Sequence, residues 1–221
     1  GGDLKGNLGR FNINVTNSDG GTAFKLAVLR DSGMLPQPVT TEPSLGLVNG
    51  KRVVFVGTGQ YLGTSDLTTT QRQTVYAVKD DNNASTIDTP RTATGANAFV
   101  AQTLTINPLD PATRIGSNSL VDWTALGGWY VDLLPALTGE GSERVHVNMD
   151  LTRGVLAFAS TVPASSVCSP GGYGYFTYLD YATGGYVPGS TGGVTSYRVN
   201  NVIVGINVAY INGVPKYLIV K

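Results

Sequence analysis

The sequence predicts an all-β protein, and three observations support this fold class. Good helix formers are scarce, because glutamate occurs only three times in 221 residues, whereas threonine, valine, tyrosine and glycine are abundant. Glycine accounts for 29 residues, nearly twice the usual share of roughly 7%. Segments with the composition of β-strands recur from one end of the chain to the other. An apolar share of 41% is enough to bury a real core.

Eight segments rich in β-branched and aromatic residues are predicted to be strands. They are residues 8–15, 51–56, 74–79, 128–133, 144–149, 154–159, 173–179 and 202–211. Several alternate between apolar and polar positions. In one of them Trp129, Val131 and Leu133 fall on one face, and Tyr130 and Asp132 fall on the other. Such strands are typical of half-buried antiparallel sheets.

A β-hairpin is predicted at the end of the chain. Asn212 and Gly213 separate the apolar run 202–211 from the run 214–221, and both can adopt the positive φ that a two-residue hairpin turn requires. Pro215 indicates an edge position, since proline cannot donate to a strand ladder.

The remaining segments are predicted to be irregular. Residues 94–106 are expected to be irregular and then a strand, because β-branched residues end the segment and no capping residues frame a helix. The stretches 31–49 and 80–97 are predicted to be long loops, dense in Pro, Asn, Asp, Ser and Thr. Neither resembles an interdomain linker, so residues 1–221 are taken as one domain.

A weak repeat favours a propeller. Residues 8–12, 76–80 and 176–180 share a pattern of apolar positions that ends in Asp or Asn before a turn. The third copy runs into residues 181–185, which resemble the strand-then-Thr-Gly ending of quinoprotein-type blades. Blades of about 40–50 residues would give about four or five in this chain, as part of a partial or modified β-propeller of antiparallel four-stranded sheets. A β-sandwich remains the alternative, because the copies are not evenly spaced.

The order of phrases along the chain resembles the C-terminal propeller region of the PilY/PilC family, large proteins at the tips of bacterial type IV pili. The resembling phrases are GDLKGNLGRFNI at 2–13, QPVTTEPSLG at 37–46, RVVFVGTGQYLGTSDL at 52–67, QTVYAVKDD at 73–81, VDWTALGGWYVDL at 121–133, ERVHVN at 143–148 and GVLAFASTVPASSVCSPGGYGYFTYLDYATGG at 154–185. Their collinear order covers nearly the whole chain. Gly9 stands where that family usually has an aromatic residue, so the first strand is expected to pack less tightly.

The resemblance implies a non-enzymatic module that supports type IV pilus assembly, surface adhesion and the balance of extension and retraction. Its implied partners are minor pilins and a host or abiotic surface, and its implied location is the pilus tip on the bacterial cell surface, reached by export through the periplasm. The acidic calcium loop of the family would precede the phrase at 2–13, so no residue of this chain is assigned to calcium. We therefore read the chain as a fragment of a longer protein, with loops 31–49 and 80–97 as candidate partner contacts. Deleting residues 82–92 is expected to reduce piliation while leaving folding intact.

Charge and hydropathy exclude two classes of partner. Fifteen basic and fifteen acidic side chains give no excess of positive charge for binding nucleic acid or a membrane surface. No apolar run reaches the ~18 residues of a membrane span, and the first nine residues lack the features of an export signal.

A glycine motif mimics a dinucleotide-binding loop. Gly57, Gly59 and Gly63 follow an apolar strand, with Asp80 downstream as a ribose acceptor. The spacing is GxGxxxG instead of GxGxxG, and no amphipathic helix follows to present its N-terminus to a phosphate. We interpret the motif as a strand that ends in a glycine turn.

His146 is the only imidazole in the sequence, which rules out a site of clustered histidines. Alternation places Val145, Val147 and Met149 on one face of the segment and His146 with Asn148 on the other. No GxSxG motif accompanies it, so a solvated strand residue is favoured over a catalytic one. Glu140 and Glu143 are interpreted as turn residues, not as a glycosidase pair.

Oxygen donors cluster in two places that superficially resemble calcium loops. They are Asp80, Asp81, Asn82, Asn83 and Asp88 in one place, and Asn17, Asp19 and Gly20 in the other. In the first place the fifth position of an EF-type loop would be Ala84 or Ser85, and the loop glycine and closing glutamate are missing. Polar turns are favoured in both.

Cys168 has no second cysteine to pair with in this chain, so a disulfide to another segment and a buried free thiol both remain open.

Six aromatic residues are candidates for a sugar-stacking surface, although aromatic residues on strands belong more often to a core. They are Trp123, Trp129, Tyr173, Tyr175, Phe176 and Tyr178. Two rival functions thus stay open, a quinoprotein-like dehydrogenase and a carbohydrate-binding β domain. This sequence lacks the adjacent cysteines and the chelating side chains that the quinone site of such a dehydrogenase needs.

Overall fold

The structure is a computed structural model that describes residues 1–11, 21, 23–82, 86–164 and 171–221. Within these residues the chain is built from β-strands and short 3₁₀ helices, which confirms the all-β fold class. The candidates Asn17, Asp19, Gly20, Asn83 and Cys168 lie outside the described residues.

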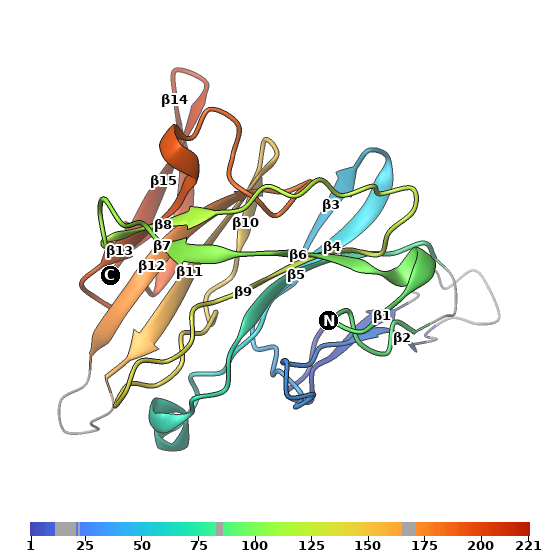
Figure 1. The fold of residues 1–221 in the computed structure, drawn as a ribbon, viewed down its shortest axis with the longest axis horizontal. Coiled ribbons are helices and arrows are strands. Elements are labelled where there is room, and N and C mark those ends of the chain that lie inside the picture. Colours follow the sequence, from blue (N-terminus) through green and yellow to red (C-terminus); the bar gives the residue numbers. More distant parts are fainter. Residues whose placement is uncertain (12–20, 22, 83–85, 165–170) are drawn as a thin grey trace.

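Four sheets follow one another across the molecule (Figure 1). The first pairs β1 (Asn7–Phe11) with β2 (Ala23–Val28). The second has the order β3 (Ser44–Val48), β4 (Lys51–Gly57), β5 (Thr74–Lys79), β9 (Gly128–Asp132) and β6 (Phe99–Gln102). The third has the order β10 (Asp150–Thr152), β11 (Val155–Pro163), β12 (Gly172–Asp180), β13 (Val194–Val199), β8 (Thr113–Gly116) and β7 (Leu104–Ile106). The fourth pairs β14 (Gly205–Ile211) with β15 (Val214–Val220). The short helices are η1 (Thr64–Thr68), η2 (Gly95–Asn97) and η3 (Thr191–Gly193).

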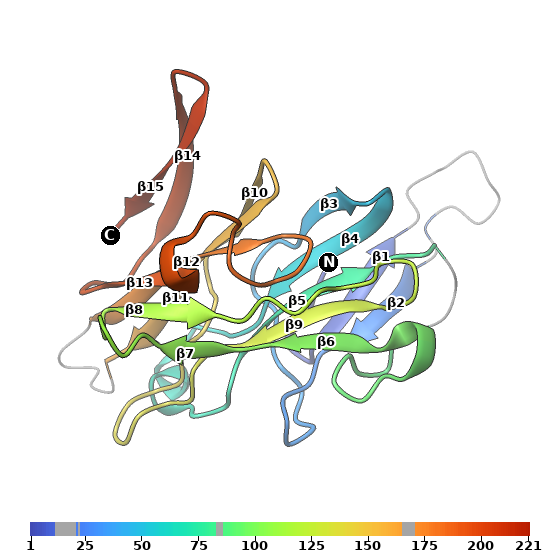
Figure 2. The same cartoon turned by 45° about the horizontal axis from the view of Figure 1, so that its top comes forward.

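Each larger sheet contains a four-stranded antiparallel unit of the kind predicted, β3-β4-β5-β9 in one and β10-β11-β12-β13 in the other. Each unit is enlarged by further strands. Strand β6 adds to β9 in the parallel sense, while β8 and β7 add to β13. Because β6 and β7 are nearly continuous in the chain, one segment joins the two sheets (Figure 2).

Hydrophobic clusters lie between successive sheets, as expected for sheets that cannot bury both faces alone. The largest joins the five-stranded and six-stranded sheets through residues such as Phe55, Trp129, Leu156 and Phe158. A second joins β1 and β2 to the opposite face of the five-stranded sheet, and a third joins the six-stranded sheet to β14 and β15. Both large sheets are therefore covered on two faces.

Most predicted strands are confirmed, including β4, β5, β9, β11 and β12, and the alternation along β9 is also confirmed. The terminal hairpin forms as predicted, with φ of 53° at Asn212 and 76° at Gly213. Residues 94–106 are irregular and then extended, as expected, except for the single turn of η2.

Two of the predicted segment assignments were wrong. The loop 31–49 contains β3 at its end. The segment 144–149 is not a strand, because Arg144 exchanges backbone hydrogen bonds with Thr161 of β11 and the next amide, that of Val145, donates to Thr58 beyond β4. Successive residues thus pair with different sheets, and no single ladder continues.

In the part of the chain that the structure describes, no helix is long and apolar enough to cross a bilayer.

Candidate interaction surface

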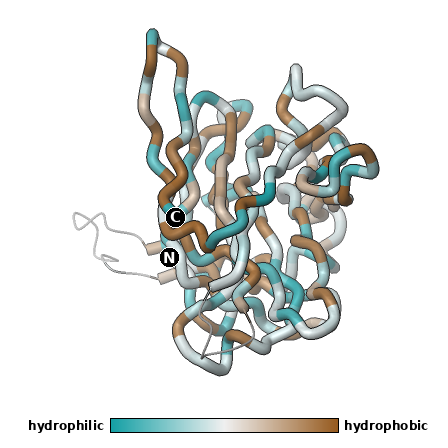
Figure 3. Tube along the Cα trace, turned by 90° about the vertical axis from the view of Figure 1, so that its left-hand side faces the viewer, coloured by the Kyte–Doolittle hydropathy of each residue, from teal (hydrophilic) through white to brown (hydrophobic). Residues whose placement is uncertain are grey.

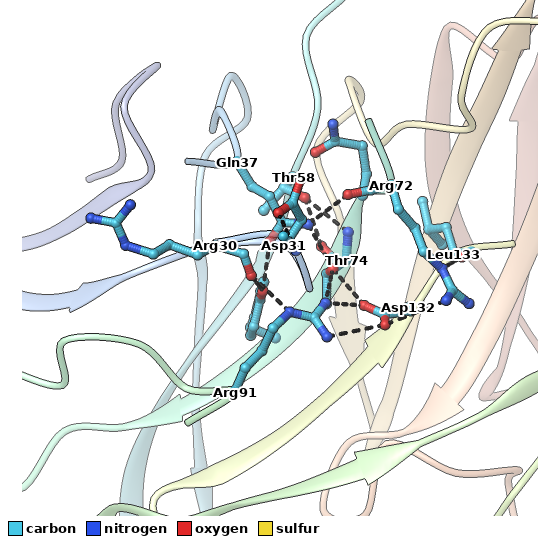
Figure 4. A network of polar contacts seen from close by, with 12 residues as sticks. Arg30, Asp31, Gln37, Thr58, Arg72, Thr74, Arg91, Asp132 and Leu133 are labelled. Atoms are coloured by element: carbon cyan, nitrogen blue, oxygen red, sulfur yellow. Dashed lines mark hydrogen bonds and ion pairs between the residues drawn. The ribbon is translucent and has the colours of Figure 1, made fainter. Parts of the chain in front are cut away.

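A buried polar network fixes the loop 80–97 to the end of the five-stranded sheet (Figure 4). The Arg91 guanidinium forms an ion pair with Asp132 and donates to the Thr74 hydroxyl at 2.9 Å and to the Arg30 carbonyl at 2.7 Å. It also lies 4.7 Å from the ring centroid of Tyr130. Burial alone would lower the pKa of Arg91, but the hydrogen bond and charge of Asp132 outweigh burial and raise it.

The network continues through Tyr76, whose hydroxyl donates to the Gln37 side-chain oxygen at 2.6 Å. The Gln37 amide donates in turn to the Arg72 carbonyl and to Thr74, each at 2.8 Å. Burial raises the pKa of the Tyr76 phenol, so this group stays neutral and serves as a fixed donor. The network therefore ties both predicted loops to one sheet, and its side chains form their hydrogen bonds within the network.

This anchoring corrects the expectation that residues 82–92 can be deleted without affecting folding. Ile87 is 7% exposed and forms a parallel bridge with Ala27 of β2, and Arg91 belongs to the buried network. A deletion would remove core and network contacts, so point substitutions on exposed side chains are the better test of this surface.

An apolar groove of about 630 Å³ lies between the β1–β2 pair and the β3–β4 edge. Leu45 and Leu47 project from one face of β3 and are 74% and 63% exposed, and Phe11 of β1 is 61% exposed. Arg10 and Asp80, which form an ion pair, line the same groove. Both predicted loops contribute, because Leu45 and Leu47 lie in 31–49 and Asp80 begins 80–97. Grouped exposed apolar side chains of this kind mark interaction surfaces.

The glycine motif is a strand end, as interpreted. Gly57 is the last residue of β4, and Gly59 has φ of 130°. A Cβ at Gly59 would lie 2.4 Å from the Cβ of Arg144, and one at Gly57 would lie 2.6 Å from a methyl group of Val145. These glycines let the segment that follows Glu143 approach the strand end, where the Arg144 guanidinium donates to the carbonyls of Gln60 and Asp66.

His146 is half-buried instead of solvated, which corrects the expectation from alternation. Its Nε2 atom lies 3.0 Å from the Thr161 hydroxyl, and its ring meets Tyr61 edge-on at 5.3 Å between centroids. Burial and the nearby charge of Arg144 lower the pKa of the imidazole. The neutral ring is thus favoured in the folded protein.

This lowered pKa predicts a loss of stability in mild acid. Below the ordinary histidine pKa of about 6.5, the unfolded chain takes up a proton more readily than the folded chain does, so the free energy of unfolding falls. His146→Gln should make that free energy decline less between pH 7 and pH 5, as measured by urea denaturation at each pH. An identical decline in both proteins would contradict this role of His146.

The sequence missed a buried ion pair. Arg114 of β8 donates two hydrogen bonds of 2.8 Å to the Glu143 carboxylate, and the two side chains are only 3% and 2% exposed. Ser160 donates a third bond to Glu143, and Arg114 stacks 3.4 Å from the ring centroid of Tyr175. Burial would lower the pKa of Arg114, but Glu143 outweighs this and raises it. The turn predicted around Glu140 and Glu143 ends before Glu143, which belongs to the core.

The structure places the other candidates in structural roles. Asp80 pairs with Arg10 and accepts the backbone N–H of Asn82, whereas Asp81 is exposed and lies 3.4 Å from the Lys79 amine. Asp88 is exposed. Among the described residues, no three side chains of His, Cys, Asp or Glu come together as a metal site.

The aromatic residues belong mainly to the core. Trp123, Trp129, Tyr175 and Phe176 are each at most 9% exposed, which removes them from any sugar-stacking surface. Tyr173 and Tyr178 are partly exposed and lie against Arg198 and Tyr197, respectively.

Comparisons with known proteins agree with this fold. The chain is 30% identical over 197 residues to a type IV pilus biogenesis factor PilY1 homolog of Xylella fastidiosa, covering 84% of this chain and 13% of the relative. A second PilY1 homolog of the same organism is 28% identical over 225 residues, covering 94% of this chain and 17% of the relative. The chain therefore spans less than a fifth of the length of these relatives. No family model matches it.

Among solved structures, the C-terminal domain of Pseudomonas aeruginosa PilY1 superposes with a TM-score of 0.75 at 21% identity. The match covers 99% of this chain and 54% of that one. It confirms the predicted all-β, modified-propeller fold. The number of blades in residues 1–221 stays a prediction.

Proposed function

Because the chain belongs to the PilY1 family of type IV pilus biogenesis factors and corresponds to the C-terminal region of those proteins, we propose that it is a non-enzymatic docking module at the pilus tip. In this proposal it contacts minor pilins, supports pilus assembly and the balance of extension and retraction, and contributes to attachment to host or abiotic surfaces. It reaches the cell surface by export through the periplasm. It is assigned no cofactor of its own, and calcium, possible in the parent protein, is assigned to no residue of this chain.

The observation that carries the proposal is the apolar groove formed where both predicted loops meet β1. A rigid β scaffold leaves recognition to the segments at its surface. Here the pairing of β3 with β4 holds Leu45 and Leu47 in place, and the ion pair with Arg10 holds Asp80. The stacked sheets would bear load through their interlocked cores.

Charge placed in the groove should impair piliation. We expect the double substitution Leu45→Asp and Leu47→Asp in the full-length protein to reduce surface pili and co-purification of minor pilins, because an apolar partner would have to desolvate two carboxylates. Folding should persist, since both side chains are more than 60% exposed. The readouts are pili per cell by electron microscopy and pull-down of the tip complex.

The matched control is Leu109→Asp with Leu120→Asp, which adds the same charge at positions 92% and 83% exposed outside the groove. Wild-type piliation in the groove variant would exclude this surface from pilus assembly.

A further inference from the structure

The terminal hairpin stands out from the body of the molecule (Figure 3). Both of its faces carry apolar side chains. Its inner face packs on the six-stranded sheet through Ile206, Tyr217 and Ile219, and the ring centroids of Tyr217 and Phe176 are 5.5 Å apart. Its outer face carries four apolar side chains that are 43–58% exposed. They are Ile211, Val214, Leu218 and Val220.

The outer edge of β15 presents unpaired backbone groups. The two-residue turn makes Ile211 and Val214 a hydrogen-bonded pair, so bonding alternates along the register from there. Tyr217 and Ile219 fall at the non-bonded positions, where both N–H and C=O point away from β14. Within the described residues, neither N–H donates to an acceptor.

The location of charge indicates the chemistry of a partner. Residues 181–221 contain no Asp or Glu, and their charged side chains are Arg198, Lys216 and Lys221. Lys216 lies on the outer face opposite Ala209, between the exposed side chains of Val214 and Leu218. An apolar face with a lysine at its middle complements an apolar segment that carries a carboxylate.

A two-stranded hairpin is marginal by itself, and this one is supported on its inner face by the six-stranded sheet, while its outer edge can accept a third strand. A helix laid on the outer face would cover the apolar side chains but would leave the N–H groups of Tyr217 and Ile219 unpaired. A strand added to the edge of β15 would pair with these N–H groups and would also place its own side chains beside the apolar outer face.

We infer that the outer edge of β15 receives an extended strand of a partner polypeptide, with apolar side chains on one face and an acidic residue beside Lys216. The inference rests on the proposed docking role and adds a second contact surface, distinct from the groove. Strand addition can be measured by peptide binding to the purified protein, independently of piliation.

The test uses purified full-length protein and a labelled nine-residue peptide that alternates valine and threonine, with aspartate in place of its central valine. We expect saturable binding by fluorescence anisotropy and slower amide hydrogen exchange in residues 214–220 when the peptide is present. Lys216→Glu should weaken binding several-fold, whereas the control Lys25→Glu, on an exposed residue of β2, should leave it unchanged.

Backbone pairing is tested with the same peptide N-methylated at alternate residues, which should abolish binding because the paired donors are lost. Equal binding of the methylated peptide would overturn strand addition. Absence of binding by the parent peptide would overturn it as well, as would full exchange protection of residues 214–220 in the free protein, since another part of the same protein would then cover the edge. Normal peptide binding combined with wild-type piliation of the Leu45, Leu47 variant would refute the groove proposal alone.

Discussion

Glu143→Leu should lower the free energy of unfolding by about 3–5 kcal/mol, because it leaves the Arg114 guanidinium buried without its counter-ion. Both nitrogens of the bidentate pair lie 2.8 Å from the carboxylate oxygens, and neither residue is more than 3% exposed. Water cannot replace the lost carboxylate at this depth without opening the space between the strands. Urea denaturation followed by tryptophan fluorescence would measure the loss.

Two further variants separate an uncompensated charge from a general loss of packing. Arg114→Met combined with Glu143→Leu removes both charges and should recover much of the stability, since buried ion pairs often exchange for apolar side chains at little net cost. Asp81→Asn breaks a looser contact of 3.4 Å in which the carboxylate is 46% exposed, and the buried Lys79 amine keeps its hydrogen bond to the Trp123 carbonyl, so this substitution should cost less than Glu143→Leu. If Glu143→Leu cost no more than Asp81→Asn, the buried pair would have no special role.

The fold could be predicted from sequence where local pattern and final environment agree. Strand β9 alternates because one face meets the core between the two large sheets, and the terminal hairpin follows from the backbone freedom of Asn212 and Gly213. Strand β3 was missed because Leu45 and Leu47, its apolar residues on one face, point to solvent and stand within a segment rich in proline and serine.

The candidate surface was predictable only in part. Composition correctly assigned much of 31–49 and 80–97 to irregular connections, but it could not show that Ile87 and Arg91 turn inward, because their partners lie on β2 and β9. The prediction that Glu143 lies in a turn was wrong for the same reason. Its partner Arg114 is 29 residues away in sequence, and only the addition of β8 to β13 brings the two together. Long-range pairing of this kind leaves no periodic signal in a single sequence.

Gly184→Ala is expected to have the second large effect, because the turn after β12 is built around the indole of Trp129. Gly184 has φ of 72°, and a Cβ there would lie 2.4 Å from two atoms of that ring. The Trp129 indole also donates to the Tyr181 carbonyl at 3.0 Å, and the Trp123 indole donates to Ala182 at 2.8 Å. The residues 181–185 that resembled a blade ending therefore connect the six-stranded sheet to the five-stranded one.

The matched control for Gly184→Ala is Gly189→Ala, where φ is 88° but nothing lies within 4 Å of the added methyl group. Both substitutions carry the left-handed backbone cost of about 1–2 kcal/mol, and only Gly184→Ala adds overpacking of about 1–3 kcal/mol. The difference between the two unfolding free energies thus isolates the contact with Trp129, and the emission of the two tryptophans should change only in Gly184→Ala. Equal losses in both variants would mean that backbone strain alone acts at this turn, and that the tryptophan does not hold the two sheets together there.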